Sequence, residues 1–260
     1  MSPRKLAILL SLAIVLGSAA LVTGCNVVTG SGKVVTWEMD YRDFTNIEAG
    51  YAFDVDVRRG DDFLVRIDID ENLYEYLNIS QTGDTLHIGL KSNALYTDTT
   101  QRATITLPEL RRLELSGAAE GKVSGFTTTR KMHFELSGAS KLSLDHVKAG
   151  DVNLELSGAS DVTGTITMKN GGFDLSGASS IELEGSADDV TIEASGASNI
   201  ILPVFTVLNA DLQLSGASEA VINASNRMDI DLSGASDIKY LGNPKLGRIN
   251  VSGASTIGPK

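Results

Sequence analysis

Five acidic side chains recur at a nearly constant interval, each of them two residues before a Ser-Gly-Ala phrase. They are Glu114, Glu135, Glu155, Asp174 and Glu193. A line of carboxylates can bind a hard cation such as Ca²⁺, which takes oxygen ligands in loose geometry. It can also supply an acid–base pair that cleaves a polysaccharide, or it can form a solvated outer face. The sequence leaves these three uses open, so the five residues are a candidate cation-binding acidic ladder.

Stacking these carboxylates has an electrostatic cost. Two unit charges about 4.8 Å apart, the spacing of neighbouring strands, repel by about 0.9 kcal/mol in bulk water. A bound cation would offset that repulsion, and so would the basic neighbours Arg112, Lys131 or Lys169.

The remaining residues that could carry chemistry give weaker signals. The histidines His87, His133 and His146 lie in different predicted strands without metal-ligand spacing. No serine stands apart from its repeated copies as a nucleophile, and no glycine-rich loop precedes a helix. We therefore predict no catalytic residue, no enzymatic activity and no cofactor other than the candidate Ca²⁺.

A repeat positions the acidic residues. The phrase Ser-Gly-Ala-Ser begins at Ser137, Ser157, Ser176, Ser195, Ser215, Ser233 and Ser252, and a variant, Ser-Gly-Ala-Ala, begins at Ser116. The copies follow one another at intervals of 18 to 21 residues. A fixed period in this range is typical of a stacked architecture in which each repeat contacts only its neighbours.

Two apolar columns flank the acidic one. Three residues before each phrase stand Leu113, Phe134, Leu154, Phe173, Ile192, Leu212, Ile230 and Ile249. One residue before it stand Leu115, Leu136, Leu156, Leu175, Ala194, Leu214, Leu232 and Val251. This alternation is typical of a strand with one buried face. It predicts an all-β solenoid, a β-helix of about eight rungs, one for each copy of the phrase.

The conformation of the phrase itself is open. Its glycine could turn a corner at positive φ or let the chain pass close to the next rung. Its second serine could bond within its own turn or to the serines above and below. Strict alternation would instead point Gly138 and Ser140 inward.

The N-terminus has the features of an export signal. Arg4 and Lys5 precede an apolar run from Leu6 to Leu16, which predicts that residues 1–24 are a signal peptide. The stretch ending in Cys25, the only cysteine, resembles the bacterial lipoprotein box, which implies a lipid attached to that sulfur. Removing residues 1–24 leaves 20 basic and 33 acidic residues, a formal charge of −13.

Three further segments follow the signal. Residues 25–36 form a lipid-anchored tether, residues 37–107 an N-terminal antiparallel β segment that caps the stack, and residues 108–260 the Ser-Gly-Ala-Ser repeats. Alternation through Phe53–Arg58, Leu64–Asp70 and Leu86–Leu90 predicts half-buried strands in the second of these segments. Glu71–Leu77 is expected to form a single helical turn.

Several motifs in order resemble a known family. Asp43–Ile47, Phe53–Val57 and Leu107–Ala118, followed by the repeats, are similar to the auto-transporter adhesin head (GIN) domain family over roughly residues 38–255. The resemblance implies a right-handed β-helix displayed on bacterial cell envelopes. It carries no catalytic residues across.

Together these patterns predict a non-enzymatic surface lipoprotein, exported and lipid-anchored on the outer face of the membrane or in the outer membrane. It would be an adhesin-like β-helical module for binding or structure. One alternative is a β-helical carbohydrate-active enzyme that acts on polysaccharide, and another is a spacer for partner proteins.

The expected partners are the membrane, through the N-terminal lipid, and an unidentified surface ligand, either glycan or protein. The acidic balance argues against nucleic acid. The last rung, ending near Ile257 without an obvious cap, indicates either self-association or a covering C-terminal tail.

Overall fold

The computed structural model describes residues 26–260, which form an all-β solenoid of about seven turns. The predicted signal peptide (residues 1–24) and Cys25 lie outside the described residues. No helix within residues 26–260 is long and apolar enough to cross a membrane.

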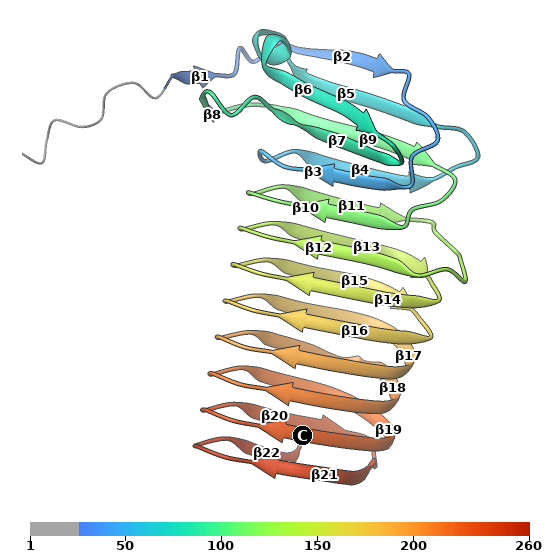
Figure 1. Ribbon diagram of the computed structural model, residues 1–260, viewed down its shortest axis with the longest axis vertical. Helices are drawn as coiled ribbons and strands as arrows, with labels where there is room; N and C mark the ends of the chain where they lie inside the picture. Colours follow the sequence, from blue (N-terminus) through green and yellow to red (C-terminus); the bar gives the residue numbers. More distant parts are fainter. Residues whose placement is uncertain (1–25) are drawn as a thin grey trace, which may run out of the picture.

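Two parallel sheets make the walls of the tube (Figure 1). One contains β10 (Arg112–Leu115), β12 (Met132–Leu136), β14 (Asp151–Leu156) and β16 (Asn170–Leu175), and the other β11 (Glu120–Ser124), β13 (Lys141–Lys148) and β15 (Asp161–Thr167). The long strands β17 (Ser180–Ala194), β18 (Asn199–Leu214) and β19 (Glu219–Leu232) run through both walls. The stack ends with β20 (Asp237–Leu241), β21 (Lys245–Val251) and β22 (Thr256–Pro259).

Equivalent residues of successive repeats stack in register. Leu154 pairs with Phe134 on one side and with Phe173 on the other, and the pairing continues through both apolar columns. These side chains are buried in every repeat except the last, where Ile249 and Val251 are exposed because no further rung covers them. The predicted solenoid and its inward-facing columns are therefore confirmed.

Each Ser-Gly-Ala phrase forms a tight corner. Its glycine adopts a positive φ of 72–78° in all eight copies. A Cβ on Gly177 would lie 2.4 Å from the carbonyl oxygen of Gly158 in the preceding rung. The N–H of Ala178 donates to that same oxygen at 2.7 Å. Both roles expected for the glycine, the left-handed turn and the close approach, are thus combined at one residue.

The second serine of the phrase points inward. Ser140 is fully buried, and its Oγ donates to the carbonyl oxygen of Ser137 in the same phrase at 2.8 Å. Ser160, Ser179, Ser198, Ser218 and Ser236 repeat this bond. Of the two bonding patterns considered, the structure shows the local turn.

The N-terminal segment contributes two rungs out of chain order. These rungs consist of β3 (Asn46–Ala49) with β4 (Asp54–Arg59), and β7 (Thr85–Leu90) with β9 (Gln101–Leu107). The β3/β4 rung lies between the later β7/β9 rung and the β10/β11 rung, and all these pairings are parallel. The parallel stack therefore begins well before residue 108.

Antiparallel strands extend both walls beyond β7 and β9. They are β2 (Val34–Met39), β5 (Leu64–Asp70) and β6 (Leu77–Thr82). The 3₁₀-helix η1 (Glu71–Tyr76) connects β5 to β6, where a helical turn was expected. A separate parallel pair joins β1 (Val27–Thr29) to β8 (Leu95–Thr97).

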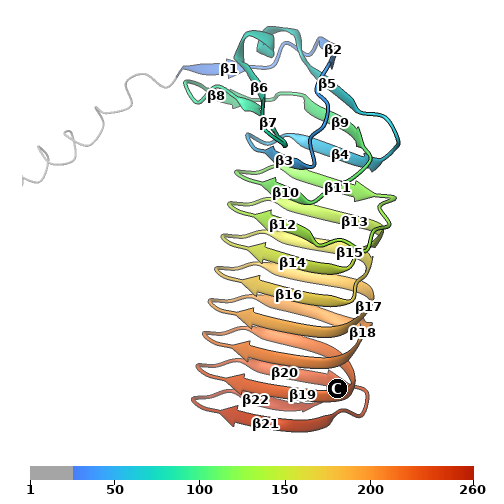
Figure 2. The same cartoon turned by 45° about the vertical axis from the view of Figure 1, so that its right-hand side comes forward.

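The two ends of the stack differ (Figures 1 and 2). At the N-terminal end, Leu73 of η1 is fully buried. At the C-terminal end, Leu246 of β21 is 37% exposed and is joined by the exposed side chains of the last rung. Two expectations stay predictions: the N-terminal segment caps the core, and the last rung self-associates.

We expect Gly177→Ala to destabilise the fold by about 3 kcal/mol or more, because strained φ adds to overlap with the neighbouring backbone. Gly32 also has a positive φ but open space around its Cβ position, so Gly32→Ala should cost only about 1 kcal/mol. Urea unfolding followed by circular dichroism compares the two. Equal losses would contradict the close-approach role.

The capping role of η1 can be tested at Leu73. Leu73→Asp buries an unpaired charge and should lower stability by about 3–5 kcal/mol. Glu75→Ala on the exposed side of the same helix should change it by less than about 0.5 kcal/mol. Thermal unfolding measures both, and an unchanged melting temperature for Leu73→Asp would show that this end needs no cover.

Candidate functional site

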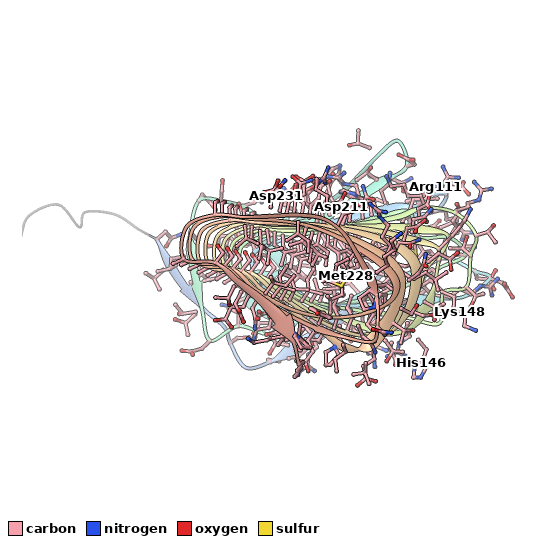
Figure 3. All side chains as sticks on the ribbon, turned by 90° about the horizontal axis from the view of Figure 1, so that it is seen from below. Arg111, His146, Lys148, Asp211, Met228 and Asp231 are labelled. Carbon is pink, nitrogen blue, oxygen red and sulfur yellow. The ribbon has the colours of Figure 1, made fainter. Side chains whose placement is uncertain are left out.

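The strand register aligns the predicted acidic ladder. Glu114 pairs with Glu135, Glu135 with Glu155, Glu155 with Asp174, and Asp174 with Glu193. The same position continues through Gln213, Asp231 and Asn250. In the view along the axis, Asp231 and Asp211 lie on one side of the tube, Met228 lies inside, and His146 lies on the other side (Figure 3).

The column also extends toward the N-terminus, which the sequence analysis missed. Glu48 of β3 pairs with Glu114, and His87 of β7 pairs with Glu48. The Nδ1 of His87 lies 2.8 Å from the Oε2 of Glu48. The signal was present in Ile47-Glu48-Ala49, which has the same apolar–acidic–apolar order as the repeats. We call Glu48, Glu114, Glu135, Glu155, Asp174 and Glu193 the acidic column.

Basic side chains neutralise the N-terminal half of this column. The Nη2 of Arg112 lies 3.2 Å from the Oε2 of Glu114 and also bonds the Oε2 of Glu135. Within residues 26–260, the ion pairs of the column do not include Lys131 or Lys169, the other two basic residues considered.

His133 joins this group, contrary to the prediction that the histidines stand alone. Its Nε2 lies 3.7 Å from the Oε2 of Glu135, and its Nδ1 lies 3.8 Å from the Oε1 of Glu155. The three side chains place ligand atoms within 4.8 Å of one another, and the Nε2 is buried without a hydrogen-bond partner. Two facts together could have revealed it: positions i and i+2 share a strand face, and adjacent rungs align Glu135 with Glu155. Arg112 already bonds Glu135, so one of the two carboxylates in this cluster has a basic partner apart from His133.

The centre of the column lacks such partners. Asp174 and Glu193 are exposed, and neither forms an ion pair with a residue that the structure describes. Beside them Gly172 leaves a shallow pocket of about 190 Å³. Its lining consists of Asn153, Glu155, Gly172, Phe173, Asp174, Thr191 and Glu193. The polar side chains in this lining can offer oxygen ligands, which suit a hard cation such as Ca²⁺.

A shallow groove runs beside the column. Its other wall is the row formed by the first serine of each phrase, which we call the serine row: Ser116, Ser137, Ser157, Ser176, Ser195, Ser215, Ser233 and Ser252. One hollow of about 370 Å³ extends from Asp174 to Ser233. A second, of about 210 Å³, extends from Glu135 to Ser176 and shares Asp174 with the first. A third hollow, of about 180 Å³, lies between Glu48 and the exposed ring of Tyr51.

Charge is balanced again near the C-terminal end. Asp229 accepts hydrogen bonds from the Arg227 guanidinium and from the backbone N–H of Arg248, and these bonds lower its pKa to about 2. Arg248 also lies 3.7 Å from Asp211. Within residues 26–260, the members of the acidic column that form no ion pair are Asp174 and Glu193, which lie midway along the stack.

This arrangement repeats one set of groups along a line. Along the groove the carboxylates repeat from rung to rung at the strand spacing, about 4.8 Å, and so do the serine hydroxyls beside them. Such a surface offers many equivalent hydrogen bonds to an extended ligand.

The family model described as "Putative auto-transporter adhesin, head GIN domain" matches residues 43–244. The chain belongs to this family. The predicted family membership is thereby confirmed over more than three quarters of the sequence.

Two solved structures of similar fold come from Parabacteroides species. A "putative lipid binding protein" from Parabacteroides distasonis is 22% identical to this protein, with a TM-score of 0.83. The alignment covers 89% of this chain and 98% of that chain. A "putative adhesin" from Parabacteroides merdae is 20% identical, with a TM-score of 0.81. That alignment covers 90% of this chain and 98% of the other. At these identities the likeness shows the fold alone. No curated protein matches the chain.

The repulsion within the acidic column can be measured at Asp174, which has Glu155 and Glu193 as neighbours. Asp174→Asn should stabilise the protein by about 1 kcal/mol at low ionic strength, and the gain should shrink with added NaCl. The matched control is Glu184→Gln, because Glu184 pairs with Thr165 and not with an acid. A gain for Asp174→Asn that is independent of salt would contradict the electrostatic account.

Proposed function

We propose that this protein is a non-enzymatic binding module of the cell envelope, anchored by a lipid on Cys25, whose ligand lies along the groove. The observation that carries the proposal is the pair of adjoining polar hollows, sharing Asp174, that are lined by residues of the acidic column and of the serine row. Membership in an adhesin-like family supports a surface-exposed location.

The repetition of the groove favours binding over catalysis. A catalytic carboxylate needs a partner that differs from it in environment, so that one group is an acid and the other a base. Asp174 and Glu193, midway along the groove, are both exposed and both lack an ion pair among residues 26–260, so their surroundings do not distinguish an acid from a base. Glu114 and Glu135 are both already bonded by the same partner, Arg112. The corners beside the groove are four-residue phrases that build no walls for an active-site cleft.

The interior favours an outer binding surface over an enclosed lipid pocket, although one neighbour is named as a lipid-binding protein. Large side chains such as Phe173, Ile192 and Leu212 are buried within the tube. Stacked at the strand spacing, these side chains fill the interior of a β-solenoid.

The chemistry of the groove indicates two ligand classes, a glycan or a basic segment of protein. Carboxylates and hydroxyls both accept hydrogen bonds from sugar hydroxyls, and the unneutralised centre attracts positive charge. Ca²⁺ held by Glu155, Asp174 and Glu193 would bridge neighbouring rungs and could complete its coordination with oxygens of a glycan.

The experiment is a panel of glycans, matrix proteins and cell-wall fragments, presented to the mature chain with Ca²⁺ or with a chelator. We expect binding to at least one class, and at least tenfold weaker binding for the triple variant Glu155→Gln, Asp174→Asn, Glu193→Gln. The control is Asp161→Asn with Glu182→Gln on the other wall, which should bind like the parent.

Three results would overturn parts of this proposal. Binding that survives the triple variant would move the ligand away from the groove. Turnover of any polysaccharide would replace a binding role with an enzymatic one. Equal binding and equal thermal stability with Ca²⁺ and with chelator would exclude the cation.

A further inference from the structure

The N-terminal end of the stack carries an exposed aromatic pair. The rings of Trp37 in β2 and Tyr74 in η1 stack with centroids 4.4 Å apart and planes at 25°. Trp37 is nevertheless 41% exposed and Tyr74 47%. Strand β2 pairs only with β5, so no other strand covers this edge. Two large aromatic side chains packed together at an exposed end are unusual for a surface that only meets water.

A second apolar group lies where the chain enters the fold. Val27 of β1 and Leu95 of β8 are strand partners, and they are 55% and 56% exposed. Val34, near the start of β2, is 47% exposed. The two strands β1 and β8 form a sheet of their own at this end (Figure 2).

Hydrogen bonds tie the two groups into one end surface. The Nδ2 of Asn72 in η1 donates to the carbonyl oxygen of Thr29 in β1 at 2.8 Å. The backbone N–H of Ser31 donates to the Oδ1 of Asn72 at 3.0 Å. An ion pair of 2.8 Å joins Lys33 to Glu71. The helix that carries Tyr74 is thus fixed against the strand that follows Cys25.

The position of Cys25 identifies what this surface meets. Only Asn26 lies between Cys25 and Val27, and two residues span at most about 7 Å. A lipid on Cys25 would therefore hold Val27 and Leu95 at the depth of the headgroups. Tryptophan and tyrosine favour that same interface, because each combines an apolar ring with a polar group.

We infer that Val27, Val34, Trp37, Tyr74 and Leu95 form a membrane-contact surface that sits in the headgroup region of the bilayer holding the anchor. This inference rests on the proposed lipid on Cys25. A diacyl anchor already secures attachment, so the contact sets orientation: it seats the N-terminal end on the bilayer and points the stack away from it.

Trp37 is the only tryptophan of the chain, so its fluorescence tests the inference directly. The full lipidated protein is reconstituted in dioleoylphosphatidylcholine vesicles, with or without bromine on the acyl chains. We expect brominated lipid to quench Trp37 emission about twofold, since an interfacial ring meets quenchers from one side only. The emission maximum of Trp37 in the vesicle-bound protein should also lie at a shorter wavelength than that of the Cys25→Ser protein in detergent-free buffer.

The matched control moves the probe to the stack. Val204 in β18 is 61% exposed and lies far from η1 along the chain, so Trp37→Phe with Val204→Trp should show no quenching by brominated lipid. A second variant, Tyr74→Ser, removes the stacking partner and should lessen the quenching of Trp37 while the far-ultraviolet circular dichroism stays unchanged.

Flotation of the vesicles separates the two claims. Protein that floats without quenching of Trp37 overturns the contact surface and leaves the anchor intact. Protein that fails to float, or a Cys25→Ser protein that floats equally well, overturns the proposed anchor and the inference that depends on it. Equal quenching of Trp37 and of the Val204→Trp probe would show that the stack lies flat on the bilayer, which also overturns the inference.

Discussion

The contact between the glycine of one corner and the glycine carbonyl of the corner before it sets the geometry of the whole stack. Because no Cβ intervenes, the two backbones approach closely enough for the following alanine to donate a hydrogen bond of 2.7–2.8 Å across each step. The corner fixes where each strand begins, and the side-chain period of two then decides which residues face inward. Every column on the outside of the tube, polar or acidic, inherits its alignment from this contact.

That alignment has opposite effects inside and outside. Inside, like residues stacked on like residues bury a continuous apolar core, in which Leu154 lies between Phe134 and Phe173. Outside, the same register places the carboxylates of neighbouring rungs next to one another. Arg112 relieves the repulsion between Glu114 and Glu135 in the N-terminal half of the column, and Arg248 lies beside Asp211 near the other end. The centre keeps its charge, and there the solenoid departs from a purely structural optimum, as expected of a functional surface.

Much of the fold could be predicted from the sequence, because a period of about 20 residues and an in–out–in pattern leave few alternatives. The order of the first rungs could not. Nothing in the chain order indicates that Asn46–Ala49 lies between Thr85–Leu90 and Arg112–Leu115. The acidic ladder was predicted residue by residue, yet Glu48 and His87 were missed because they precede the first Ser-Gly-Ala phrase. His133 was missed because its partner Glu155 belongs to another rung, and only the register brings the two together.

The displaced first rung has a consequence for how the protein matures. The chain is synthesised from its N-terminus, yet β3 and β4 find their parallel neighbours only after residues 85–124 have followed. Repeats further along need only the rung before them, so their local pairing can propagate step by step. Closing the first rung instead requires contacts across a long loop, which costs chain entropy and slows that step. The rung of β3 and β4 is thus complete only after the first of the eight phrases, at Ser116, has been followed by β11.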